Sequence, residues 1–170
     1  MKLLLGIGTR FRGDDAAGLL VAERAGGAGM ESPDAARLLS AWDGVTDLVV
    51  IDAVQSGAPP GTIHCFEAAR APLPADLFAS GSHAFGLAQA IELGRALERL
   101  PERVTVYGIE GKQFGFGETI SPEVEAAISE LSERISQREN GVGVAPVLPQ
   151  EVVGVSADER HAGPRLPVVG

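Results

Sequence analysis

Basic residues are scarce in this chain of 170 amino acids. Fourteen Lys and Arg stand against 23 Asp and Glu, which gives a formal net charge of −9. A protein that binds nucleic acid needs a basic face to displace counterions from phosphate, and an anionic membrane attracts the same positive charge. We therefore expect neither nucleic acid nor a membrane surface as a partner.

Cysteine and long apolar runs are also lacking. Cys65 is the one cysteine, so an internal disulfide framework is excluded. No apolar run approaches the ~20 residues that span a bilayer, and the stretch near the N-terminus is too short for a secretory signal. We expect a cytoplasmic protein without membrane insertion. Its hydrophobic content of 45% is enough for one sizeable core.

Short apolar runs alternate with helical patterns along residues 1–138. Strands are predicted at 2–8, 47–54, 62–68 and 103–110, and helices at 14–26, 32–42, 82–100 and 121–138. The run 47–54 is continuously apolar and β-branched, as in a central parallel strand, whereas 62–68 alternates poorly and suggests an edge. The alternation predicts a single three-layer α/β domain: a twisted, mostly parallel sheet of four or five strands with helices on both faces.

Two other segments have a distinct composition. Residues 26–33, "GGAGMESP", are interpreted as a loop, followed by a helix with Ser32 as N-cap and Pro33 in its first position. Residues 139–170 are dense in glycine and proline and show no sustained period. We interpret them as a disordered tail beyond the domain at 1–138.

Three groups of polar residues follow strands or open a helix on the same side of the predicted sheet. Asp14 and Asp15 follow the first strand, Asp52 ends the central strand, and His83 lies in the first turn of the long helix. Ligands of such sheets collect at the carboxyl ends of the strands. We therefore expect these residues to lie near one another.

The chemistry of each residue narrows its role. Consecutive helical residues point about 100° apart, so only one of Asp14 and Asp15 faces the crevice, and the other acts on the helix dipole. Asp52, in an apolar strand, is costly to bury without a partner. His83 is either a helix cap or a neutral imidazole, since a helix N-terminus disfavours the charged ring. Two carboxylates and an imidazole form a partial shell for a divalent transition metal, with open positions.

Several competing motifs fail on inspection. The glycine loop after the first strand has Phe11 where a dinucleotide fingerprint needs its third glycine, and neither a Walker A motif nor G-x-S-x-G is present. His64 and Cys65 are adjacent in a strand, so they point to opposite faces. Cys65 is interpreted as a core residue, with a thiol protease pairing Cys65 and His83 as a minor alternative.

Four motifs occur in a characteristic order: "GIGTRFRGDDAAG", "VVIDAV", "SHAFGL" and "GIEGKQFGFGETISPEVEAAI". Together they resemble the hydrogenase maturation endopeptidases, over about residues 2–136. The resemblance implies an endopeptidase that removes a short C-terminal peptide from the precursor of a [NiFe]-hydrogenase large subunit after nickel insertion. It also implies that the enzyme recognises the nickel, which the precursor supplies. Carried over position by position, the nickel-contacting and catalytic residues are Asp15, Asp52 and His83.

The implied mechanism uses water rather than a side-chain nucleophile. Nickel either polarises the scissile carbonyl, or lowers the pKa of water, or serves only as an anchor. Arg10 and Arg12 are either contacts for carboxylates of the precursor or solvated surface. Two other functions remain as alternatives: a receiver-type domain phosphorylated on Asp52 with Mg²⁺, and a nickel-sensing maturation chaperone without catalysis.

Overall fold

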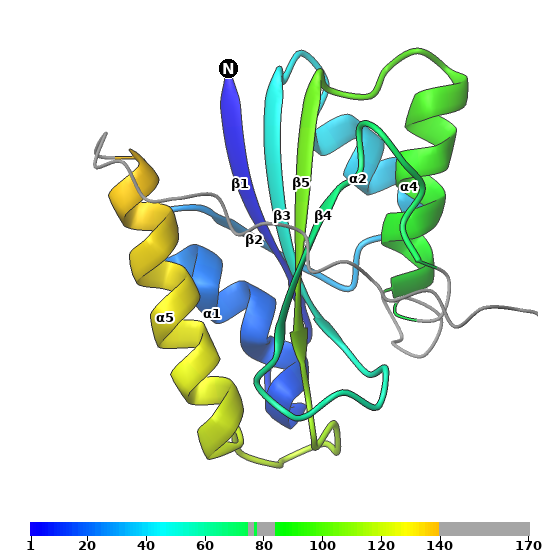
Figure 1. Ribbon diagram of the computed structural model, residues 1–170. Coiled ribbons are helices and arrows are strands. Elements are labelled where there is room, and N and C mark those ends of the chain that lie inside the picture. Colours follow the sequence, from blue (N-terminus) through cyan, green and yellow to red (C-terminus); the bar gives the residue numbers. More distant parts are fainter. Residues whose placement is uncertain (75–76, 78–83, 140–170) are drawn as a thin grey trace, which may run out of the picture.

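The computed structural model describes residues 1–74, 77 and 84–139. Its five strands form one sheet in the order β2-β1-β3-β5-β4 (Figure 1). The strands are β1 (Lys2–Gly8), β2 (Ala28–Glu31), β3 (Asp47–Val54), β4 (Ile63–Glu67) and β5 (Arg103–Glu110). All neighbours are parallel except β4, which runs antiparallel to β5 at the edge. The predicted α/β class and the edge position of residues 62–68 are confirmed.

Helices cover both faces of this sheet. They are the short 3-10 helix η1 (Gly13–Ala16) and the α-helices α1 (Ala17–Arg24), α2 (Ala35–Ala41), α4 (Ala84–Ala96) and α5 (Pro122–Glu139). Figure 1 shows α1 and α5 on one face and α2 and α4 on the other. Among the described residues, no helix is long and apolar enough to cross a membrane.

The central strand β3 contributes to a hydrophobic core on each face. Val50 and Val54 pack in the layer of α2 and α4, whereas Ile51 and Ala53 pack in the layer of α1 and α5. Side chains alternate across a strand, so a strand covered on both sides is apolar at successive positions. Burial on both faces of the sheet therefore explains the continuous apolar run of residues 47–54.

Two local predictions are wrong. Residues 28–31 form β2 rather than a loop, pairing with β1 from Leu5↔Ala28 to Gly8↔Glu31. Strand pairing uses backbone groups, so an edge strand forms without β-branched side chains when the neighbouring strand offers free partners. The helix that follows begins at Ala35 and not at Pro33, because Asp34 is its N-cap and accepts a hydrogen bond from the Arg37 backbone nitrogen at 2.8 Å.

Candidate functional site

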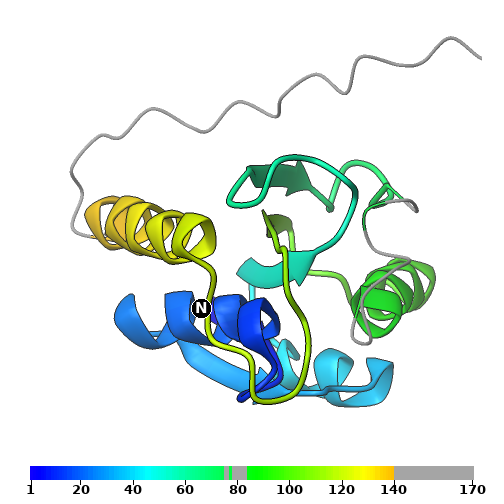
Figure 2. The ribbon, with the colours of Figure 1, turned by 90° about the horizontal axis from the view of Figure 1, so that it is seen from below.

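The carboxyl ends of β1, β3 and β5 meet at one edge of the sheet, which Figure 2 views from below. Glycines let the first loop and α1 lie directly on this edge. A Cβ atom at Gly18 would overlap the carbonyl oxygens of Ile7 and Ile51, and one at Gly8 would overlap the carbonyl oxygen of Asp15. The glycines of the opening motif therefore bring the backbone of Asp15 against the end of β1, a contact no other residue allows.

Asp14 is fully buried and accepts hydrogen bonds from the loop between β5 and α5. One carboxylate oxygen accepts from the backbone nitrogens of Lys112 (2.8 Å) and Gln113 (3.1 Å) and from the Ser121 hydroxyl (2.8 Å). The other accepts from the Ser121 backbone nitrogen at 2.7 Å. Asp14 thus joins two loops that are about a hundred residues apart in the chain, which the sequence did not predict.

Backbone hydrogen bonds extend this junction between the first loop and residues 111–121. Figure 2 shows the two segments running side by side. The backbone nitrogens of Gly13, Asp14 and Gly117 donate to the carbonyl oxygens of Glu118 (3.1 Å), Gln113 (2.9 Å) and Phe11 (2.7 Å), respectively. The two loops therefore form one connected unit at the edge of the sheet.

The side chain of Asp52 lies inside the protein, and 1% of the residue's surface is exposed. Its Oδ1 accepts a hydrogen bond from the Ala53 backbone nitrogen at 2.8 Å, whereas its Oδ2 is buried and has no hydrogen-bond partner within the described part of the chain. Burial raises the pKa of Asp52 well above its usual value, the negative charge of Asp15 raises it further, and the Ala53 hydrogen bond opposes both. Asp15, itself buried, and Asp52 therefore form an electrostatically coupled pair.

The third predicted residue, His83, lies outside the described residues. It directly precedes Ala84, the first residue of α4. Asp52 lies two residues from both Val50 and Val54 in β3, and side chains two residues apart in a strand point to the same face. The Asp52 side chain is therefore on the face that α4 covers. Over residues 1–74, 77 and 84–139, no group of three His, Cys, Asp or Glu could hold a metal ion. The structure thus brings two of the three predicted residues together.

Glu110 is a further buried carboxylate at this edge, and the sequence reasoning missed it. It ends β5 and accepts hydrogen bonds from the Ser56 backbone nitrogen (2.7 Å), the Ser56 hydroxyl (2.8 Å) and the Gly57 backbone nitrogen (3.0 Å). His64 Nε2 lies 3.2 Å from Glu110 Oε2, the oxygen that also accepts from the Ser56 hydroxyl. Glu110 therefore holds the loop after β3 in place. Its signal was available, since it ends an apolar strand as Asp52 does.

Cys65 is a core residue, as predicted. It packs with Tyr107 in the layer of α1 and α5, and burial raises the pKa of its thiol. His64, its neighbour, points to the other face and reaches Glu110. Because α4 covers the face opposite to Cys65, the geometry argues against the thiol-protease alternative.

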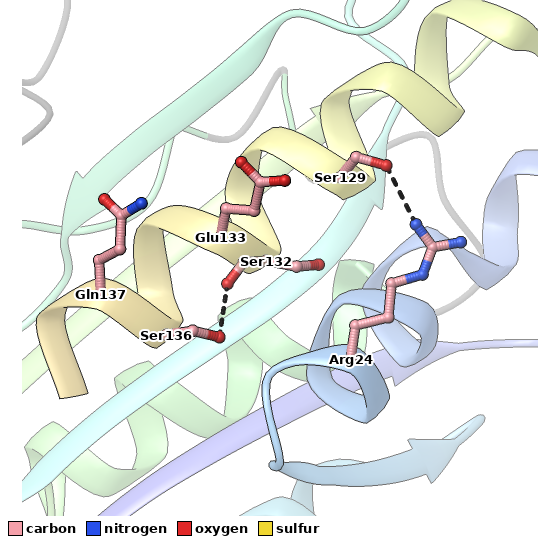
Figure 3. A pocket seen from close by; sticks show the side chains of 6 residues that line it. All are labelled: Arg24, Ser129, Ser132, Glu133, Ser136 and Gln137. Carbon is pink, nitrogen blue, oxygen red and sulfur yellow. Dashed lines mark hydrogen bonds between the residues drawn. The ribbon is translucent and has the colours of Figure 1, made fainter. Parts of the chain in front are cut away.

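A separate hollow of about 370 Å³ lies between α1 and α5 (Figure 3). It is lined by Arg24, Ser129, Ser132, Glu133, Ser136 and Gln137. Arg24 closes one end by donating to the Ser129 hydroxyl at 3.2 Å and pairing with Glu125 at 2.8 Å. None of the acids at the carboxyl edge contributes to this hollow.

The fold and its edge define a class: a single-domain α/β protein that places a pair of buried carboxylates at the carboxyl ends of parallel strands. The family model of the hydrogenase maturation protease HycI matches residues 27–138, more than half of the chain. The chain belongs to the hydrogenase maturation protease family. The matched range contains Asp52 and His83 and begins after the loop of Asp15. None of the curated proteins compared with the chain matches it.

Solved structures of maturation proteases have the same fold. The endopeptidase HybD from E. coli is 24% identical over 82% of this chain and 93% of its own, with a TM-score of 0.69. The endopeptidase HycI from Escherichia coli is 23% identical over 89% of this chain and 99% of its own, with a TM-score of 0.66. The [NiFe] hydrogenase maturation protease HybD from Thermococcus kodakarensis is 26% identical over 84% and 99%, with a TM-score of 0.62.

Family membership makes the chain a peptidase of hydrogenase maturation, which confirms the function that the ordered motifs predicted. The receiver-domain and chaperone alternatives are therefore set aside. The family model does not include the first loop, where the sequence motif resembles the family. The structural matches cover most of the chain and agree with that resemblance.

Proposed function

We propose that Asp15, Asp52 and His83 bind the nickel carried by the precursor of a [NiFe]-hydrogenase large subunit, and that the enzyme then removes a short C-terminal peptide from it. One observation carries this proposal. The buried carboxylate of Asp52 keeps one oxygen without a hydrogen bond, beside the negative charge of Asp15. Such an arrangement is unfavourable for the protein alone, and a dication would relieve it.

The donor set suits a borderline transition metal. Carboxylate oxygens and an imidazole nitrogen are both used by nickel, and three protein ligands leave coordination positions to the groups that already hold the metal in the precursor. Nickel is here part of the substrate. Recognition of the metal then ensures that only a loaded precursor is cut, because an empty precursor offers nothing to neutralise Asp15 and Asp52.

Cleavage requires water, which adds to the scissile carbonyl carbon. The C–N bond then breaks, leaving a new carboxylate on the large subunit and an amine on the released peptide. The contribution of Asp15 and Asp52 is positioning: by holding the nickel, they fix the C-terminal segment beside them. Positioning of reacting groups lowers a reaction barrier by several kcal/mol in well-oriented systems. This corresponds to a rate increase of order 10⁵ or more.

The test incubates the protein with nickel-loaded and nickel-free cognate precursor and follows the precursor mass. We expect loss of a C-terminal peptide with the nickel-loaded form alone. Asp15→Ala, Asp52→Ala and His83→Ala should each abolish cleavage without unfolding the chain, whereas Asp43→Ala, at an exposed acid paired with Arg99, should cleave normally. Cleavage of nickel-free precursor would refute metal recognition, and normal cleavage by all three site variants would refute the site.

A further inference from the structure

Two phenylalanines stand out on the joined loops of the carboxyl edge. Phe11 is 75% exposed and Phe116 is 85% exposed. Among the described residues, the other exposed large apolar side chains are Met1, Leu93 and Leu97, none of which is aromatic or belongs to these loops. Exposed aromatic groups that gather next to a candidate active site are typical of interaction surfaces.

Phe11 is exposed at a conformational cost. Its φ of 64° lies in the left-handed region, which bulky residues other than glycine rarely adopt. The strained backbone is held because the Gly117 nitrogen donates to the Phe11 carbonyl oxygen at 2.7 Å. If the position served only to turn the chain, glycine would suffice. An aromatic residue held there, with its ring in solvent, indicates a role for the ring itself.

The two rings are carried by a firmly held support. Phe116 directly precedes Gly117, so the backbone hydrogen bond to Phe11 brings the two positions next to each other. Asp14, three residues after Phe11, accepts four hydrogen bonds from the loop that carries Phe116. The backbone that carries both rings is therefore ordered before binding, so less conformational freedom is lost when a partner docks on them.

The two arginines of the first loop already have partners within the chain. Arg10 pairs within the chain with Glu23 and Glu31, and Arg12 donates to the Phe114 carbonyl oxygen at 3.3 Å. The alternative that these arginines bind carboxylates of the precursor is thereby weakened. Phe11 is the exposed large apolar side chain of this loop.

We propose that Phe11 and Phe116 form a docking platform for the hydrogenase large-subunit precursor, and that they bind apolar side chains of the polypeptide next to its nickel. This inference rests on the proposed function. The occupant follows from continuity with the site: Phe11 and Asp15 belong to the same loop, four residues apart, and the loop of Phe116 is bonded to Asp14. A polypeptide whose nickel reaches Asp15 and Asp52 therefore has these rings at its side.

The test uses variants that remove the rings and leave the fold. Phe11→Gly suits the positive φ, so we expect its melting temperature to equal or exceed that of the wild type. Phe116→Ser changes a residue that is 85% exposed. Leu97→Ser is the matched control, because Leu97 is 51% exposed and follows α4 at the opposite end of the sheet.

We measure Kd for nickel-loaded precursor by calorimetry, and KM and kcat for its cleavage. Phe11→Gly and Phe116→Ser should each raise Kd and KM about tenfold with little change in kcat, as expected for an interface aromatic. Phe116→Leu should recover most of the affinity, and Leu97→Ser should match the wild type. Wild-type Kd and KM in both ring variants would overturn the platform.

Two further results separate the explanations. Light scattering on the wild type and on Phe11→Gly tests self-association. A wild-type dimer that the variant dissociates, with unchanged KM, would assign the rings to a second copy of this chain and overturn the proposal. If the wild type binds the precursor but does not cleave it, the proposed function fails, whereas a tenfold loss of binding in the ring variants still supports the platform.

Discussion

Asp14 and Asp15 are adjacent in the chain, yet their surroundings are opposite in character. Asp14 accepts four hydrogen bonds from the loop after β5. Asp15 is buried beside Asp52, and its charge opposes ionisation of that residue. At the scale of single residues, Asp14 therefore stabilises the fold, whereas Asp15 and Asp52 carry an electrostatic cost that a bound cation would remove.

Removing the Asp14 carboxylate should destabilise the protein. Asp14→Ala leaves the nitrogens of Lys112, Gln113 and Ser121 without their acceptor, at a cost of about 3 kcal/mol in the free energy of unfolding. Urea denaturation measures this difference. Asp43→Ala, at an exposed acid, should change stability by less than about 0.5 kcal/mol. Equal stabilities of the two variants would contradict the role assigned to Asp14.

The raised pKa of Asp52 predicts how stability depends on pH. Between its ordinary value of 3.8 and the raised value, the folded protein holds a proton that the unfolded chain has lost. Stability from this group therefore falls as pH rises through that window. In chelator-treated protein, Asp52→Asn should melt above the wild type near pH 7, with the gap narrowing toward about pH 4. Thermal unfolding followed by circular dichroism is the measurement, and a gap independent of pH would contradict it.

At the scale of elements, the placement of the site depends on how closely α1 approaches the sheet. Gly6 lies in β1 and Gly18 in α1, and a Cβ on Gly6 would overlap the Gly18 carbonyl oxygen. The glycines thus act as contact points between layers rather than as a phosphate-binding loop. The first motif resembles a nucleotide fingerprint because both arrangements need a helix packed tightly over the end of a strand.

Gly18→Ala should separate α1 from the sheet. The added methyl group meets the backbone carbonyls of Ile7 and Ile51, which cannot move without disturbing β1 and β3. We expect a loss of about 3 kcal/mol in stability by urea denaturation, together with reduced cleavage. Gly94→Ala is the matched change in α4, where the nearest atom is a side-chain carbon of Leu39. It should be neutral or stabilising, and similar losses in both variants would contradict the close approach.

At the scale of the whole molecule, two helical layers enclose one sheet, and the functional edge is formed by loops that follow β1, β3 and β5 (Figure 2). The final helix completes the core through Val124, Ile128, Leu131 and Ile135. The family match ends at residue 138, near the end of α5 at Glu139. We therefore keep the division into a domain at 1–138 and a separate tail as a proposal.

Removal of residues 140–170 tests this division. If the domain folds without them, the free energy of unfolding should stay within about 0.5 kcal/mol of the full chain, and cleavage should persist. Truncation after residue 133 is the control, since it removes the buried side chain of Ile135 and should destabilise the chain by about 2 kcal/mol or more. A comparable loss of stability on removal of residues 140–170 alone would show that the tail packs on the domain.

Local patterns in the sequence were enough to predict the strands and helices with strong periodicity, such as 47–54 and α5, because such a pattern reflects which faces of an element are covered. It also marked Asp52, since an acid is costly at the end of an apolar strand. It missed β2, whose pairing comes from the backbone of β1. The folded chain was needed to show that Asp14 joins two distant loops, that Glu110 holds a third loop, and that Phe11 is exposed. Such contacts depend on which loops the parallel sheet brings together, and no local pattern records them.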